Sequence, residues 1–189
     1  MQQENRKDQI IRVAAKLFKE KGYSAVTMRD LASSLGIKAA SLYNHINSKQ
    51  DILKSIIISI AEEFTEGMNV IQVSNNSSID KLKQIVKLHV TISSQNIYGM
   101  ASLNNDWMHL EEADQVHFIK LRDAYEQNFR TIIHQGIKEG SIKNIHPEVV
   151  LYSILSTLRT LYLWYEKRGK LEVNILKRDL SATLLHGIV

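Results

Sequence analysis

A short stretch near the amino terminus combines side chains that suit contact with a nucleic acid. Residues 38–49 read KAASLYNHINSK. Tyrosine and histidine can donate hydrogen bonds to phosphate oxygens, whereas serine and asparagine can bond to base edges or to phosphates. Alanine lets a helix come close to the bases, and its methyl group can contact a thymine methyl. A helix with this exposed face is therefore a candidate for reading DNA.

Ten residues are the candidates for DNA contact. Thr27 begins a predicted helix, where its hydroxyl and the free backbone amides offer a seat for a phosphate. Lys49 stands at the start of another predicted helix and adds a mobile cation. The candidates are Thr27, Arg29, Lys38, Ala39, Ala40, Ser41, Tyr43, Asn44, His45 and Lys49.

Two capping boxes and one glycine predict the helices that position these residues. The Thr-x-x-Asp box at residues 27–30 opens a short helix that closes at Gly36, and a third helix over 38–44 follows. The Ser-x-x-Asp box at residues 48–51 opens a long fourth helix. Two short helices joined by a glycine turn form the helix-turn-helix arrangement, whose second helix can enter a major groove. A lone pair of this kind is more often scaffold, so other features must support the interpretation.

The charge distribution provides such support. Residues 1–60 contain ten Lys and Arg against five Asp and Glu, whereas the remainder contains fourteen against fifteen. The first third of the chain therefore carries all of the excess positive charge. This asymmetry favours a phosphate-facing module joined to a neutral one, although a solvated basic face would look the same.

Composition and apolar periodicity predict an all-α fold of about nine helices. The 189 residues include one proline and eight glycines, so long uninterrupted helices are possible. We expect a three-helix helix-turn-helix domain at 1–48 and a helical ligand-binding and dimerisation domain at 49–189. The helix over 49–68 would connect them. Later helices are expected at about 112–138, 147–167 and 173–185.

The stretch GYSAVTMRDLASSLGIKAASLYNHINSKQDIL resembles the amino-terminal domain of TetR-family transcriptional regulators. The matching positions are Gly22, Thr27, Leu31-Ala32, Gly36-Ile37, Leu42-Tyr43, His45 and Ser48-Lys49. The resemblance implies that Thr27, Tyr43, His45 and Lys49 contact phosphates and that residues 38–44 read bases.

The chain departs from the family pattern at three positions. Lys38 replaces the usual small hydroxyl residue that opens the third helix, which leaves the cap of that helix open. Ala40 stands where glycine is common, and Ile46 stands where phenylalanine is usual. The last two changes are conservative in packing and leave the expected fold intact.

The later helices favour dimerisation. The helix from Pro147 is apolar nearly all round, and such a helix must be buried on all sides. Packing with the last helix against a second copy would give a two-fold four-helix interface, whereas a central core helix is the alternative. The resemblance favours the homodimer. The expected interface residues are Leu151, Leu155, Leu158, Leu176, Leu180 and Leu184.

Aromatic, flexible and polar residues of the second part suit an apolar ligand pocket. The candidates are His89, Met100, Trp107, Met108, Tyr125, Phe129, Tyr152, Arg159 and Tyr162. Arg159 is a charge within an apolar helix and should need a partner. That partner is either a ligand carboxylate or phosphate, or an acid across the dimer, and the structural pair is favoured.

Two segments of the second part, RDAYEQNFRTIIHQGIKEGSI and LWYEKRGKL, are similar to TetR-type regulators of fatty-acid and sterol catabolism. This similarity implies a small apolar or acyl-CoA-like effector.

Other classes of function find little support in the sequence. No cysteine, HExxH, Glu-x-x-His, P-loop or GxGxxG occurs, so we expect no catalytic residues, metal or cofactor. No apolar run is long enough for a membrane span, and the polar amino terminus is unlike a signal peptide. We predict a cytoplasmic homodimer that regulates transcription, as a repressor, by binding a palindromic double-stranded DNA operator. A helical protein-interaction adaptor and an all-helical enzyme without DNA binding are the alternatives.

Overall fold

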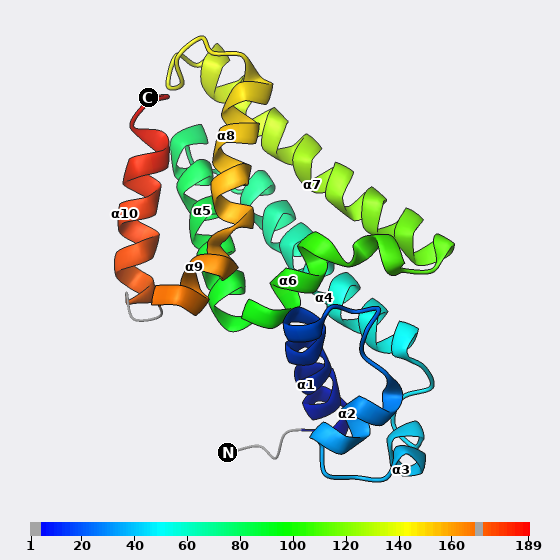
Figure 1. The fold of residues 1–189 in the computed structure, drawn as a ribbon. Helices are drawn as coiled ribbons and strands as arrows, with labels where there is room; N and C mark the ends of the chain where they lie inside the picture. Colours follow the sequence, from blue (N-terminus) through cyan, green and yellow to red (C-terminus); the bar gives the residue numbers. More distant parts are fainter. Residues whose placement is uncertain (1–4, 169–171) are drawn as a thin grey trace. The chain divides into compact units, whose positions relative to one another are not determined.

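The computed structural model describes residues 5–168 and 172–189. These residues form ten α-helices and one short 3₁₀ helix, η1, with no strand among them (Figure 1). The predicted all-α fold is confirmed. The helices are α1 (Arg6–Lys21), α2 (Met28–Ser34), α3 (Ala39–Tyr43), α4 (Lys49–Val73), α5 (Ser78–Gln95), α6 (Ile97–Asn105), η1 (Trp107–His109), α7 (Glu112–Lys138), α8 (Pro147–Arg159), α9 (Leu161–Arg168) and α10 (Val173–Leu185).

One predicted helix is divided in the structure. The helix expected over 147–167 is interrupted at Thr160, which separates α8 from α9. The Thr160 hydroxyl donates to the carbonyl of Ser156 at 3.2 Å and lies 3.0 Å from that of Thr157. A threonine side chain that bonds to the preceding turn competes with the regular helix pattern. The apolar periodicity continues across this point, so it did not reveal the break.

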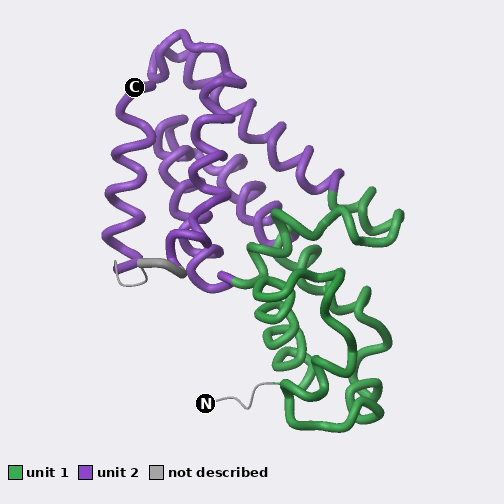
Figure 2. Tube along the Cα trace, in the orientation of Figure 1, with its two compact units in different colours: residues 1–61, 98–118 green, residues 62–97, 119–189 purple. Residues whose placement is uncertain are grey.

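The chain divides into two compact units (Figure 2). Unit 1 comprises residues 1–61 and 98–118, and unit 2 comprises residues 62–97 and 119–189. Unit 1 therefore combines the amino-terminal helices with α6, η1 and the start of α7. These units are defined by packing, and the functional division at residue 48 stays a prediction.

The core of unit 1 anchors the first three helices to one another. Ile10 and Phe18 of α1, Leu31 of α2 and Leu42 of α3 are almost completely buried. Burying one such side chain contributes about 1.5–3 kcal/mol, so each of these residues stabilises the packing of the three helices substantially. They fix α3 through its apolar side and leave its other side to solvent.

In unit 2, helix α5 packs against α8, α9 and α10. Its buried residues Leu82, Ile85, Val86 and Val90 recur at helical spacing and form the centre of the core. Phe129 of α7 is also completely buried. A single amphipathic helix thus organises the second unit, as its periodicity predicts.

Candidate DNA-binding surface and ligand-binding region

Helices α2 and α3 form a helix-turn-helix. Gly36 has a φ of +66°, in the left-handed region that residues with a Cβ avoid. The Ile37 amide donates to the Ala32 carbonyl at 3.0 Å, which closes the end of α2. The glycine therefore turns the chain between the two helices, as the sequence indicates.

Helix α3 separates a core side from an exposed side. Leu42 and, just beyond the helix, Ile46 are 0% and 3% exposed. Exposed residues are Lys38, Ala40, Ser41, Tyr43, Asn44 and His45, whereas Ala39 is half-buried. The predicted face is thus available to a partner. Lys38 occupies the N-cap without a side-chain cap bond, so the helix begins one residue later than predicted.

The phosphate seat predicted at Thr27 is built around a complete capping box. The Asp30 amide donates to the Thr27 hydroxyl oxygen at 3.2 Å, and the Thr27 amide donates to the Asp30 carboxylate at 2.8 Å. Hydrogen bonds from the side chain and backbone of Thr27 lower the pKa of Asp30. First-turn amides have no partner within a helix, so those of Met28 and Arg29 are the donors suited to a phosphate.

Lys49 is engaged within the protein. Its Nζ donates to the carbonyls of Tyr23 and Val26, both at 2.9 Å, and lies 4.2 Å from the Tyr23 ring centroid. Burial lowers the pKa of Lys49. An ammonium group has three donors, so one remains for a phosphate. The predicted phosphate contact stays a prediction. In the structure, Lys49 also stabilises the loop before α2, because it bonds to two carbonyls of that loop.

A second group of contacts joins η1 and the start of α7 to the same region of unit 1. The His109 ring stacks on Tyr23 with centroids 5.3 Å apart, and the His109 carbonyl accepts from Gln50 Nε2 at 2.7 Å. Lys54 pairs with Asp114 at 2.8 Å. Sequence reasoning gave His109 no role, because its contacts come from residues far away in the chain.

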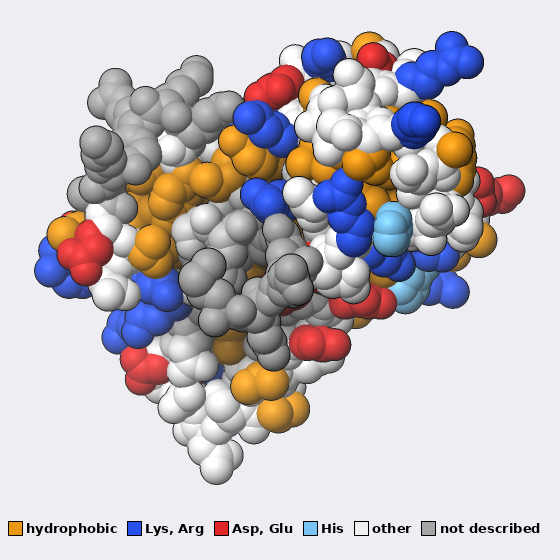
Figure 3. Space-filling view, turned by 90° about the horizontal axis from the view of Figure 1, so that it is seen from below, with side chains coloured by type: hydrophobic (Ala, Val, Ile, Leu, Met, Phe, Trp, Pro, Cys, Tyr) orange, Lys and Arg blue, Asp and Glu red, His pale blue; other side chains and the backbone are white. Residues whose placement is uncertain are grey.

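Positive charge accompanies the helix-turn-helix. Arg29 and Lys38 are exposed residues of this region. Figure 3 shows several Lys and Arg side chains close to histidine side chains on the face of unit 1 that it presents. Such a surface attracts a polyanion before any specific contact forms.

The predicted pocket residues are divided between the two units. Met100, Trp107 and Met108 belong to unit 1, and the other six belong to unit 2. Met100 is buried, Trp107 lies 5.6 Å from the Phe118 ring, and Met108 is 62% exposed. The pocket as a whole therefore stays a prediction, and only its members in unit 2 can be compared with one another.

Three predicted pocket residues form a buried aromatic cluster in unit 2. His89 Nε2 lies 2.8 Å from the Tyr125 hydroxyl, and Phe64 is 4.5 Å from the His89 ring. Phe129 contacts Tyr125, with ring centroids 6.5 Å apart. Burial, followed by the positive charge of Arg159, lowers the pKa of His89 to about 3. The imidazole is therefore neutral at physiological pH.

The cluster retains unused hydrogen-bonding capacity. His89 Nδ1 and the Ser93 hydroxyl are buried without a hydrogen-bond partner among the described residues. They are four residues apart on α5, which places them on one face of the helix. Buried polar groups are normally hydrogen-bonded, so an orphaned pair points to a bound polar group or water.

Arg159 forms an ion pair within its own chain. Its Nη2 lies 2.7 Å from Glu126, and Glu126 also pairs with Arg130 at 3.3 Å. Arg130 in turn contacts Glu148, which lowers the pKa of that carboxyl. Glu126, on α7 of the same chain, is thus an acid partner of Arg159. Arg159 and the 73% exposed Tyr152 also line a surface groove of about 440 Å³.

Most predicted dimer-interface residues belong to the core of a single chain. Leu151, Leu155 and Leu158 are at most 5% exposed, and Leu176 is 8% exposed. Leu180 and Leu184 are half-buried. The large apolar residues that α8 exposes are Val149 and Tyr152, at 56% and 73%. Periodicity identified an apolar helix but did not separate its core side from its outer side.

Within the described residues, no three His, Asp or Glu side chains are arranged to hold a metal ion. None of the described helices has the length and apolar content needed to cross a bilayer.

The chain belongs to the TetR family. Residues 10–56 match the family of bacterial regulatory proteins named after TetR, and residues 75–188 match a tetracyclin repressor-like C-terminal domain. The helix-turn-helix with its exposed α3 face is thus the DNA-binding element of a transcriptional regulator.

Three known proteins illustrate the similarity. The HTH-type transcriptional repressor KstR2 of Rhodococcus jostii RHA1 is 23% identical over 185 residues, or 97% of this chain and 91% of that protein. The structure of the ketosteroid regulator KstR2 of Mycobacterium tuberculosis has a TM-score of 0.91 at 21% identity, with 100% and 97% of the two chains covered. AibR in complex with isovaleryl coenzyme A and operator DNA has a TM-score of 0.79 at 19% identity, with 95% and 97% covered.

Proposed function

We propose that this protein is a cytoplasmic, homodimeric repressor that binds a near-palindromic operator and leaves it when a small effector binds. The observation that carries the proposal is the construction of α3, which is anchored by Leu42 and Ile46 and exposes a polar face. Two such helices in a two-fold dimer would enter successive major grooves. Residues 1–48 would form the DNA-binding domain and residues 49–189 the regulatory one.

The roles of the DNA contacts follow from their chemistry. Ser41 and Asn44 would bond to base edges, and Ala39 and Ala40 would allow close approach. Tyr43 and His45 would donate to phosphates and so set the register of the protein on the duplex.

The dimer would bury the exposed apolar residues of α8. Val149 and Tyr152 are more than half exposed in the single chain, and exposed apolar surface of this kind favours association. Their place on the outer side of α8 makes them better interface candidates than the leucines of its inner side. A two-fold dimer would bring each residue near its own copy or a neighbouring one.

The effector would bind at the buried cluster of α5 and α7. Phe64 and Phe129 are buried apolar rings of this cluster, while His89 Nδ1 and the Ser93 hydroxyl lack a hydrogen-bond partner among the described residues. An acyl group with a polar carbonyl, as in an acyl-CoA, fits these features. AibR, which has the same fold, was solved with isovaleryl coenzyme A, which supports this class of effector.

Release would be a shift between two conformations. In one conformation the spacing of the two helix-turn-helix elements of the dimer fits the operator, and in the other it does not. An effector that binds more tightly to the second conformation lowers the operator affinity, by no more than the ratio of its affinities for the two conformations.

The decisive experiment is selection of bound sequences from random duplex DNA, followed by release tests with a panel of acyl-CoAs. Enrichment of a palindrome whose half-sites lie about 10 base pairs apart, or a multiple of that spacing, is expected. As a specificity test, Asn44→Ala should relax selection at one position per half-site, at a cost of about 1–3 kcal/mol. Asn144→Ala, also an exposed asparagine, is the matched control. No enrichment above random sequence would contradict the proposal.

A further inference from the structure

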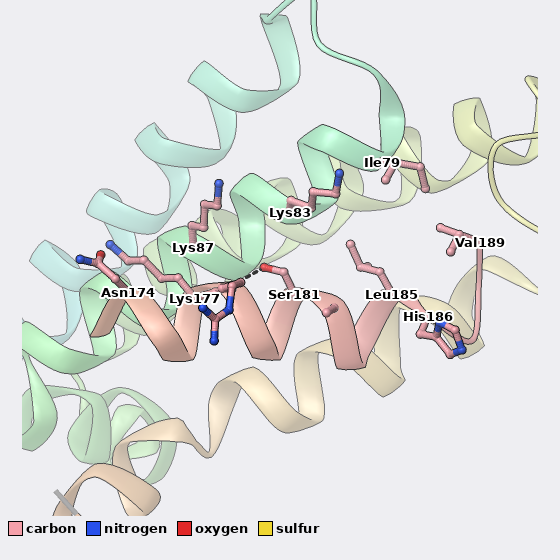
Figure 4. A pocket seen from close by; sticks show the side chains of 11 residues that line it. Ile79, Lys83, Lys87, Asn174, Lys177, Ser181, Leu185, His186 and Val189 are labelled. Atoms are coloured by element: carbon pink, nitrogen blue, oxygen red, sulfur yellow. Dashed lines mark hydrogen bonds between the residues drawn. The ribbon is translucent and has the colours of Figure 1, made fainter. Parts of the chain in front are cut away.

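A basic groove lies in unit 2, between α5 and α10, apart from the buried aromatic cluster. It has a volume of about 900 Å³ and is open to solvent. Lys83 and Lys87 contribute from α5, and Lys177 and Arg178 contribute from α10. Figure 4 shows the lysines of the two helices along the same groove. The cations thus come from two helices rather than from one solvated helix face.

The charges of this groove are only partly neutralised. Asp80 pairs with Lys83 at 2.9 Å, and Asp179 pairs with Arg178 at 2.7 Å. None of the residues that line the groove is acidic. Lys87 and Lys177 form no ion pair among the described residues, although the charge of Lys87 helps to lower the pKa of the nearby Asp80 carboxyl.

The groove also has an apolar part. Ile79, Ala182, Leu185 and Val189 line it together with the cations. Asn174 provides an amide that can both donate and accept hydrogen bonds. A ligand with an anionic end and a flat apolar or aromatic body would meet complementary surface at both ends.

We infer that this groove binds a small organic phosphate of the nucleoside diphosphate type. Lys87 and Lys177 contact the phosphate oxygens, since an ammonium group binds phosphate as a compact point charge. The base stacks on the apolar residues at the other end of the groove, and Asn174, which lies at the same end as Lys87 and Lys177 (Figure 4), bonds to a phosphate or sugar oxygen. A volume of about 900 Å³ falls within the range of small-molecule sites, which is roughly 300–1,000 Å³.

The chemistry separates this ligand class from two simpler ones. A bare phosphate would use the lysines but leave the apolar residues uncovered. A fatty acid would cover the apolar residues but would present one carboxylate to the two lysines. A phosphate ester that carries a ring uses both the lysines and the apolar residues of the groove. Binding of such a ligand here requires neither an operator nor an effector at the buried cluster.

The test is calorimetric titration of the full-length protein with ADP, inorganic pyrophosphate and octanoate at low salt. ADP should bind most tightly of the three. The variant Lys87→Glu/Lys177→Glu should weaken ADP binding by roughly tenfold or more, because both charge-assisted contacts become repulsive. The matched control is Lys120→Glu/Lys138→Glu, which makes the same charge change at two exposed lysines of α7. This control variant should change the ADP affinity by about twofold or less, because screened charges outside the groove act weakly on the ligand.

Three results would overturn the inference. The first is the absence of measurable ADP binding, and the second is an equal loss of affinity in the groove variant and the control, which indicates diffuse attraction. The third is pyrophosphate binding as tight as ADP binding, which removes the role of the apolar residues. Retained helicity in circular dichroism and retained operator binding would show that the groove variant is folded.

Discussion

Lys49→Met is the substitution that best separates bracing of the DNA-binding loop from phosphate contact. Methionine keeps much of the side-chain length but loses the two hydrogen bonds to the carbonyls of Tyr23 and Val26, each 2.9 Å long. Hydrogen bonds from a charged donor are worth about 1.5–3 kcal/mol each. The desolvation that lowers the pKa of Lys49 offsets part of this. We therefore expect the free energy of unfolding to fall by about 2 kcal/mol.

The effect on DNA binding is measured independently. If the third donor of Lys49 contacts a phosphate, the slope of log K against log salt for operator binding should fall in magnitude by about 0.9. Urea denaturation gives the free energy of unfolding. Fluorescence anisotropy with labelled operator DNA, at salt concentrations from about 50 to about 200 mM, gives the slope. An unchanged slope with reduced stability would refute the phosphate contact and leave the brace. Unchanged stability would refute the brace. Lys120→Met, at an exposed site on α7, is the control.

Three further predictions concern unit 2. Because the pKa of His89 falls to about 3 on folding from 6.5, the folded state binds fewer protons, so stability should fall as pH drops from 6.5 to 3. Urea denaturation should show that His89→Gln loses about 2–3 kcal/mol less unfolding free energy than the parent protein between about pH 7.5 and pH 4.5. An equal loss in both proteins would contradict the lowered pKa of His89. Arg159→Met and Glu126→Gln should show a coupling energy of about 0.5–1 kcal/mol in a double-mutant cycle, and zero coupling would mean that the ion pair adds nothing. Gly136→Ala should lower the free energy of unfolding by about 1–3 kcal/mol, because a Cβ would lie 2.5 Å from Ile142 Cδ1 and 3.0 Å from Ser78 Cβ. A melting temperature equal to that of the parent protein would refute this prediction.

Local signals predicted the helix-turn-helix region of the chain well. The box at Thr27 and Asp30 forms with both of its hydrogen bonds, and Gly36 has the left-handed backbone that its position required. Ser48 accepts from the Asp51 amide at 3.0 Å, at the predicted start of α4. These features depend on residues within four positions of one another, so the sequence contains their cause.

Features that depend on distant residues escaped the prediction. Lys49 turns to carbonyls more than 20 positions away, and His109 stacks on a tyrosine 86 positions earlier. The partner of Arg159 is Glu126, on a different helix. Periodicity identifies an apolar face but does not state what covers it, so it did not show that the leucines of α8 are already buried within the single chain.

Helix α7 contains residues of both units, so we propose it as the link between effector binding and DNA binding. Its first turn belongs to unit 1, where Asp114 pairs with Lys54 of α4, and its later residues Tyr125 and Glu126 belong to unit 2. An effector that moves Tyr125 therefore acts on the same helix whose start holds α4, the helix that begins at Lys49. Coupling of this kind requires two discrete arrangements of α7, and the sharpest sign of them would be a Lys54–Asp114 contact whose strength changes when effector binds.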